Sequence, residues 1–222
     1  MVLKNVVELK YYEHFLLLTC AVRILSHPED CETNNDCASE MLKEFVGKFT
    51  ELYGVEDTSY NIHSLLHLAD DVKLFGHLDS YSAFKFENFM QILKKMVKKS
   101  SFPIQQIRNR LNERNFYLDN NTESILKQKF NFTNKSPNNY CGVGDKVLKI
   151  YKSDNNIIEG KFLKNLNSYF NYPIPSDEFL IFCCNKESYH QQMQTLKIHE
   201  ITSKYVKLEL HENIVIIPLQ HY

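Results

Sequence analysis

The sequence predicts an α+β protein in which a helical N-terminal region is followed by a small antiparallel β barrel or sandwich. Residues 1–117 contain stretches whose apolar residues recur every three or four positions, the period of an amphipathic helix. Residues 141–222 instead contain short β-branched and aromatic runs, several of them alternating apolar with polar residues as half-buried strands do. The predicted boundaries are therefore 1–117 for the helical region, 118–140 for a linker and 141–222 for a β-rich domain.

Five helices are expected in the first region, at residues 4–26, 37–53, 60–73, 84–99 and 103–117. Pro28 stops the first helix, Asn35 or Asp36 can cap the second, and Pro103 suits the first turn of the fifth. Residues 75–83 are expected to form a loop. The apolar face predicted for the fourth helix contains Phe86, Phe89, Met90, Leu93, Met96 and Val97.

Six strand-like runs follow the linker, at residues 146–151, 160–163, 178–184, 195–201, 205–210 and 213–219. The residues His211, Glu212 and Asn213 separate the last two runs and predict a hairpin turn. Several short strands within about 80 residues are typical of a small barrel or sandwich. The preceding 118–140 stretch is rich in Asn, Ser and Lys, which indicates a linker.

The net charge, the length of the apolar runs and the cysteine pattern limit the classes of protein to which the chain can belong. The formal net charge of −1 does not indicate a nucleic-acid binder over the whole chain, and no apolar run reaches the roughly 18 residues of a membrane span. The six cysteines contain no CxxC pattern, and Cys183 and Cys184 are adjacent within an apolar run. Reduced, buried thiols are therefore expected, as in an intracellular protein.

Charge is unevenly distributed along the chain. Residues 29–57 carry nine acidic residues against two lysines, whereas residues 84–114 carry eight basic residues against Glu87 and Glu113. One interpretation is a solvated helix face; the other is contact with nucleic-acid phosphates. The predicted DNA-binding residues are Lys94, Lys95, Lys98, Lys99, Arg108, Arg110 and Arg114.

Two histidines and one glutamate are the candidate catalytic and metal-binding residues. His63 and His67 are four residues apart, so a helix would place both imidazoles on one face, within reach of one zinc ion. The alternative is that both are ordinary residues at the helix edge. Glu87 either stabilises the start of its helix or is a metal-binding carboxylate. A single glutamate cannot build a two-metal Mg²⁺ centre.

The stretch 60–113, "YNIHSLLHLADDVKLFGHLDSYSAFKFENFMQILKKMVKKSSFPIQQIRNRLNE", resembles the C-terminal region of transposases of the CACTA (En/Spm-like) class. In that region a histidine-rich helix is followed by a G-x-L loop, an F-E pair and a basic helix. The chain is also similar to transposase-domain proteins of animal genomes, through "YYEHFLLLTCAVRIL" at 11–25. The resemblance covers about residues 1–117.

This resemblance implies a ribonuclease-H-like core with a catalytic triad of two aspartates and a glutamate. Related Transib-type transposases and the antigen-receptor recombinase pair two histidines with a cysteine doublet on zinc. By that resemblance His63 and His67 are the histidine half of a zinc site, and Glu87 is the third acid. The upstream aspartates and the CxxC doublet are not found in this sequence. We therefore expect a catalytically incomplete, transposase-derived nuclear protein, with Mg²⁺ bound only if the aspartates are supplied.

In the transposase-derived interpretation, the β domain would serve interaction, through self-association or contact with a host protein. Two other interpretations remain open from the sequence. The chain could instead be a protein-interaction module without a nucleic-acid role, made of a helical domain and a β barrel. It could instead be a complete nuclease that uses Glu87 with Asp70, Asp71 and Asp79. The sequence "CGVGD" at 141–145 lacks the lysine and the following helix of a phosphate-binding P-loop.

Overall fold

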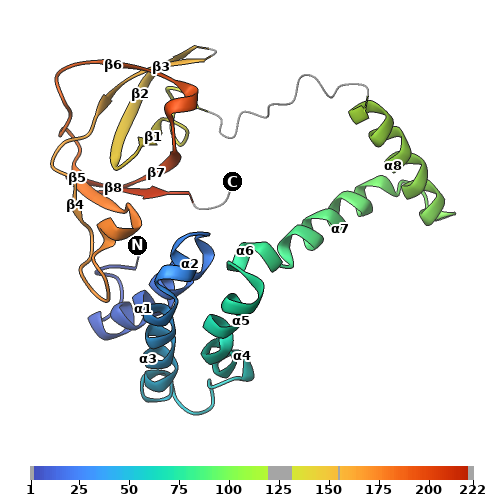
Figure 1. The fold of residues 1–222 in the computed structure, drawn as a ribbon, viewed down its shortest axis with the longest axis horizontal. Helices are drawn as coiled ribbons and strands as arrows, with labels where there is room; N and C mark the ends of the chain where they lie inside the picture. The colour runs from blue at the N-terminus through green and yellow to red at the C-terminus, as the bar shows by residue number, and fades with distance from the viewer. Residues whose placement is uncertain (1–2, 120–131, 155, 220–222) are drawn as a thin grey trace. The chain divides into compact units, whose positions relative to one another are not determined.

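The computed structural model describes residues 3–119, 132–154 and 156–219, which form two compact units (Figure 1). The first unit comprises residues 1–78 and 129–222, and therefore joins the N-terminal helices to the β-rich region. The second unit comprises residues 79–128. This division by contacts differs from the sequence boundaries at 117 and 140, because the helices that precede residue 78 share a core with the strands.

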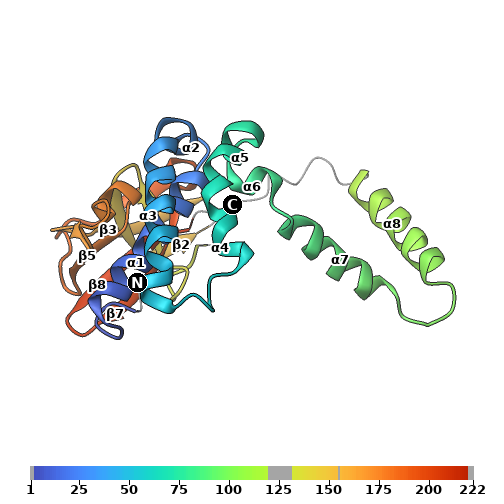
Figure 2. The same cartoon turned by 90° about the horizontal axis from the view of Figure 1, so that it is seen from below.

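The first unit begins with a helical layer, whose elements are α1 (Leu9–Ser26), α2 (Asp30–Thr33), α3 (Asn35–Tyr53), α4 (Tyr60–Ser64), a 3-10 turn (Leu65–His67) and α5 (Leu68–Phe75); the short α6 (Leu78–Tyr81) follows at the boundary between the units. α1 and α3 lie side by side in both views (Figures 1 and 2). Each buries one stripe at helical spacing, including Leu17 and Leu25 of α1 and Leu42 and Phe45 of α3. The helix predicted at residues 37–53 is confirmed as α3.

The helix predicted over 60–73 is interrupted. A 3-10 turn at Leu65–His67 separates α4 from α5. Asn35, expected as a possible cap, is instead the first residue of α3; it is buried, and its side-chain amide donates a hydrogen bond to the carbonyl of Ala69 at 3.0 Å. Its role is therefore to hold α5 against α3.

The β-rich region forms one antiparallel sheet of eight strands in the order β4-β5-β8-β7-β1-β2-β3-β6. The strands are β1 (Tyr140–Val143), β2 (Lys146–Asp154), β3 (Ile157–Phe162), β4 (Asn167–Ser168), β5 (Phe182–Asn185), β6 (Gln194–Lys197), β7 (Ser203–Leu210) and β8 (Asn213–Pro218). Strands β4 and β6 remain as edges, so the sheet is not closed into the predicted barrel. The α+β class is confirmed, and the hairpin predicted at residues 211–213 joins β7 to β8.

The sheet is covered on both faces. On one face, Val147, Leu163, Phe182, Ile214 and Ile216 pack together. On the other face, the helices pack against Tyr169, Phe170, Ile181 and Val215, while Phe132 packs against Leu148, Ile150 and Ile158. β8 contributes to both cores, which explains why its sequence is a continuous apolar run rather than an alternating one. Phe132, Asn139 and Tyr140 are buried here, although the sequence placed them in the linker.

The second unit contains α7 (Phe84–Met96) and α8 (Pro103–Asp119), two helices joined by a short loop (Figure 2). The apolar face predicted for the fourth helix is on α7, but much of it faces solvent: Phe86 is 73% and Met90 52% exposed. The apolar periodicity is therefore present in α7, but the helix pair has too few neighbours to cover this face. None of the helices in the described ranges has the length and apolarity that a membrane crossing requires.

Candidate functional site: the basic helix pair and the sheet groove

The basic residues predicted from the sequence gather on the α7–α8 pair. We define the basic hairpin surface as Lys94, Lys95, Lys98, Lys99, Arg108, Arg110 and Arg114. Six of these side chains are exposed and Arg110 is half-buried. Within the described part of the chain, none of the seven forms an ion pair with an acidic residue. The surface therefore offers its charge to a ligand from solution.

The loop that carries Lys98 and Lys99 is held by one side chain of α8. The Gln106 side-chain oxygen accepts hydrogen bonds from the Lys98 and Lys99 amides at 2.9 and 3.2 Å. Its nitrogen donates to the Lys99 and Ser101 carbonyls at 2.9 and 2.6 Å. Four bonds to one residue fix the backbone from which both lysines project. No sequence motif predicted this role for Gln106.

The two compact units differ in charge. Residues 79–128 contain nine basic and five acidic residues, a formal charge of +4. The remaining residues contain 17 basic and 22 acidic residues, a formal charge of −5. The near-neutral net charge of the whole chain therefore conceals a strongly basic unit. A concentration of positive charge of this kind is what binding to a polyanion requires.

The structure brings His63 and His67 together. Their ring centroids are 5.7 Å apart with the rings at 72° to each other, and both side chains are exposed. The 3-10 turn keeps them neighbours although the helix is interrupted. Among the described residues, no group of three or more His, Cys, Asp or Glu side chains could hold a metal ion. The half zinc site at His63 and His67 therefore stays a prediction.

Glu87 lies in the first turn of α7, where a carboxylate interacts favourably with the helix dipole. It belongs to the second unit, whereas His63 and His67 belong to the first. Asp70 and Asp71 occupy the first turn of α5, and Asp79 lies in α6. These carboxylates do not form a three-ligand cluster in the described ranges, so the nuclease interpretation gains nothing from the geometry.

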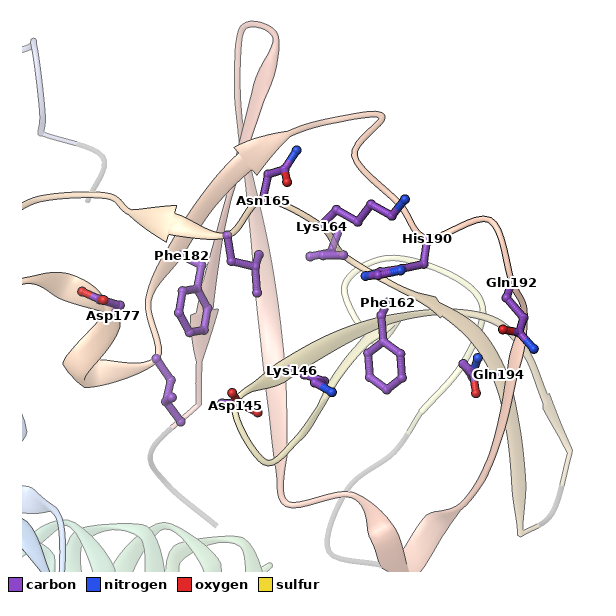
Figure 3. Close-up of a pocket in the computed structure, with 13 residues that line it drawn as sticks. Asp145, Lys146, Phe162, Lys164, Asn165, Asp177, Phe182, His190, Gln192 and Gln194 are labelled. Atoms are coloured by element: carbon purple, nitrogen blue, oxygen red, sulfur yellow. The ribbon is translucent and has the colours of Figure 1, made fainter.

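A groove of about 920 Å³ opens on the sheet, and the sequence did not predict it (Figure 3). Its apolar part includes Leu163 and Phe182, which belong to the core between the strands. Figure 3 shows Asp177 and Phe182 toward one end and Gln192 and Gln194 toward the other. Because the lining comes from segments spread over residues 145–194, no local motif could have indicated it.

The rim of the groove carries both signs of charge, with Asp145, Lys146, Lys164, Asp177 and His190 around it. Asp145 lies in the β1–β2 hairpin turn after Gly144, whose φ of 59° suits a glycine. In the "CGVGD" sequence, the first three residues belong to β1 and the last two form this hairpin turn. An apolar floor with a mixed polar rim is a general binding geometry that favours no single ligand class.

The buried thiols are poor candidates for nucleophiles. All six cysteines are free, and Cys20 and Cys141 are fully buried. Burial raises the pKa of each of these two thiols to about 12, which keeps them protonated near neutral pH. Cys37 is exposed. The prediction that the cysteines are buried is thus correct for most positions and wrong for Cys37.

Comparison with known proteins places the chain in a family. Residues 105–219, about half of the sequence, match the family described as Domain of unknown function (DUF8592). The chain belongs to this family. The DUF8592 match begins within α8 and runs to the end of the sheet, so it includes Arg108, Arg110 and Arg114 as well as the groove. No curated protein and no solved structure matches the chain.

Proposed function

We propose that this chain derives from the C-terminal region of a transposase and binds the phosphate backbone of DNA through the basic hairpin surface. The observation that carries the proposal is a set of seven basic side chains on one helix pair, without acidic partners in the described residues. Phosphate contacts by such residues supply most of the sequence-independent affinity for nucleic acid. The resemblance of residues 60–113 to CACTA transposases supports DNA as the polyanion.

The arrangement of the helix pair supports the proposal further. Lys94 and Lys95 occupy the last turn of α7, where the helix dipole favours cations. Lys98 and Lys99 follow on the loop held by Gln106 and precede the positive end of α8. A phosphate beside this loop would interact with both the lysines and the start of α8. By helical spacing, Lys95 lies opposite the apolar stripe of α7 and Lys94 lies beside it, so phosphate contact by these two lysines leaves the stripe accessible.

The finer assignments belong to the same proposal. The helical region would be the end of a ribonuclease-H-like core, with Glu87 as the third acid of a triad. His63 and His67 would supply half of a zinc site, and Mg²⁺ would bind only with aspartates supplied from elsewhere. We propose no cleavage by the described residues alone, because they contain no three-ligand carboxylate cluster. A nuclear location would follow from DNA binding.

The proposal is tested by comparing two variants, each of which has four lysines replaced by alanine. In the test variant, Lys94, Lys95, Lys98 and Lys99 become alanine. In the control variant, the same change is made at four lysines of the first unit that are paired with acidic residues: Lys10, Lys48 and Lys73, which are exposed, and Lys186, which is half-buried. Binding to a labelled DNA duplex is measured by fluorescence anisotropy at low salt.

We expect the test variant to lose at least tenfold in affinity and the control variant to lose much less. Both variants change the net charge equally, so the comparison separates a localised surface from a general charge effect. Equal losses in the two variants, or no binding by the wild type, would remove the basis for the proposed function.

The second candidate function is a protein-interaction module without nucleic-acid binding. The exposed apolar face of α7 favours it, because phosphate binding does not require Phe86 or Met90 to face solvent. Under this alternative, the wild type would not bind the duplex at low salt, and substitution of the four lysines would have no effect on affinity.

A further inference from the structure

A row of tyrosines and lysines crosses the sheet of the first unit. Tyr140 of β1 is paired with Tyr205 of β7 on one side and with Lys149 of β2 on the other. Lys149 is in turn directly opposite Lys161 of β3. Since alternate residues of a strand share a face, Lys149 lies on the same face as Val147, and Lys161 on the same face as Leu163. The four side chains therefore run across one face.

The facing lysines are an unusual pair. Like charges directly opposite on antiparallel strands repel each other and destabilise the sheet. Both lysines are half-buried, and in the described ranges neither forms a hydrogen bond or ion pair through its ammonium group. By contrast, Lys152 on the same strand is 3.9 Å from Glu159. An anion placed between Lys149 and Lys161 would relieve the repulsion.

A β-bulge in strand β2 places the aromatic ring of Tyr151 beside Lys149. The register between β2 and β3 shifts between Ile150 and Lys152, so Tyr151 is an extra, bulged residue without a partner on β3. β-bulges of this kind redirect a side chain. The Lys149 ammonium lies 5.1 Å from the centre of the Tyr151 ring, which is 40% exposed. The bulge therefore places an accessible ring beside the lysine.

Two further tyrosines complete the cluster. The Lys149 ammonium also lies 5.0 Å from the centre of the Tyr189 ring. The Tyr189 hydroxyl is 3.3 Å from that of Tyr140, where either oxygen can donate. Two rings within 5.1 Å hold the ammonium through cation–π attraction while leaving it free of carboxylates.

We propose that Lys149, Lys161 and Tyr151 form a binding site for single-stranded nucleic acid. The two ammonium groups bind a backbone phosphate, and the exposed Tyr151 ring stacks on an adjacent base. Basic residues interleaved with accessible aromatic rings are the common chemistry of single-strand binding surfaces. An acidic peptide would satisfy the lysines but would leave the exposed ring beside them without a role, so a nucleotide fits better.

This site goes beyond the proposed function because it lies in the other compact unit and requires none of the residues of the basic hairpin surface. An experiment can therefore contradict single-strand binding on the sheet without contradicting DNA binding by the helix pair, and the reverse. Single-strand binding is measured in the full chain whose Lys94, Lys95, Lys98 and Lys99 are already alanine, so that the helix pair contributes little to the signal.

The probe is a labelled oligothymidylate of about 12 nucleotides, within the range of known single-strand sites. Tyr151→Ala should weaken binding about fivefold or more, whereas Tyr151→Phe keeps the ring and should bind as before. Lys149→Ala with Lys161→Ala should weaken binding and reduce the salt slope by about 0.7 for each phosphate that the lysines no longer neutralise. The matched control replaces Lys186 and Lys207, which both contact Glu209 elsewhere on the sheet.

Full affinity in Tyr151→Ala would overturn the proposal. An equal loss in the Lys186 and Lys207 control would also overturn it, because the effect would then follow net charge alone. Competition by poly-glutamate as effective as unlabelled oligothymidylate would assign the site to acidic peptides instead. Thermal unfolding of each variant, compared with Tyr151→Phe, separates loss of binding from loss of folding.

Discussion

Strands β2 and β3 pack closely at Gly160, and this close packing predicts a large loss of stability when a single methyl group is added there. Gly160 lies on β3 opposite Ile150, next to the bulge at Tyr151. A Cβ atom added to Gly160 would fall closer than 3.0 Å to the Leu148 side chain and to the Lys149 carbonyl oxygen. Leu148 is fully buried and the carbonyl belongs to the strand backbone, so neither can move aside cheaply.

The expected cost of Gly160→Ala follows from these contacts. Extra methyl groups in a packed core typically cost about 1–3 kcal/mol, and a clash with backbone belongs at the upper end, about 3 kcal/mol. For a chain of this size each kcal/mol lowers the midpoint of thermal unfolding by about 2–4 °C. We therefore expect a midpoint about 6–12 °C below that of the wild type.

Gly47→Ala is the matched control for this prediction. Gly47 lies inside α3, and an added Cβ would meet nothing within 4 Å. Alanine there should stabilise the helix by about 0.5–1 kcal/mol and raise the midpoint by about 1–4 °C. Both variants are compared with the wild type by circular dichroism during heating. A Gly160→Ala variant as stable as the wild type, or a Gly47→Ala variant as unstable as Gly160→Ala, would refute the reasoning.

Four other predictions follow from the described geometry. Gln106→Ala should speed hydrogen exchange of the Lys99 amide about fivefold, since it removes a hydrogen bond worth about 1 kcal/mol; unchanged exchange would contradict the role of Gln106. Iodoacetamide should alkylate exposed Cys37 in the folded protein and buried Cys20 only after unfolding, as mass spectrometry would show. Burial raises the pKa of the Cys20 thiol from 9.0 to about 12, so on raising the pH the unfolded state loses this proton before the folded state does. The free energy of unfolding, measured by urea titration, should therefore fall as pH rises from 9 towards 12. The fall should be smaller in Cys20→Ala. The proposed zinc half-site predicts one equivalent of zinc by elemental analysis that is lost in His63→Ala; zinc retained in this variant would contradict it.

The sequence predicted those helices and strands whose formation depends mainly on neighbouring residues. The period of apolar residues identified α3 and α8 to within two residues at each end. It could not show that the 60–73 stretch contains a 3-10 turn, because residues such as Leu65 suit either helix type. Short β-branched runs identified most of the strands. β1 was missed because Tyr140 and Cys141 follow a polar stretch and are followed by glycine.

The site was harder to predict than the elements. The basic residues of α7 and α8 were visible because charge density is a property of the sequence itself. Burial is not, and the exposure of Phe86 depends on what surrounds α7. Likewise, the pairing of Lys149 with Lys161 and the bulge at Tyr151 depend on strand register, which joins residues a dozen positions apart. These features required the three-dimensional arrangement.

The salt dependence of DNA binding by the wild-type chain tests the central claim most directly. If the seven basic residues of the hairpin surface each contact a phosphate, a plot of log affinity against log salt should have a slope of roughly −6, since each contact contributes about −0.9. Loss of the four lysines Lys94, Lys95, Lys98 and Lys99 should reduce the magnitude of this slope by roughly 4. A slope near zero, or one that the four-lysine variant leaves unchanged, would contradict a phosphate-binding role for the α7–α8 pair.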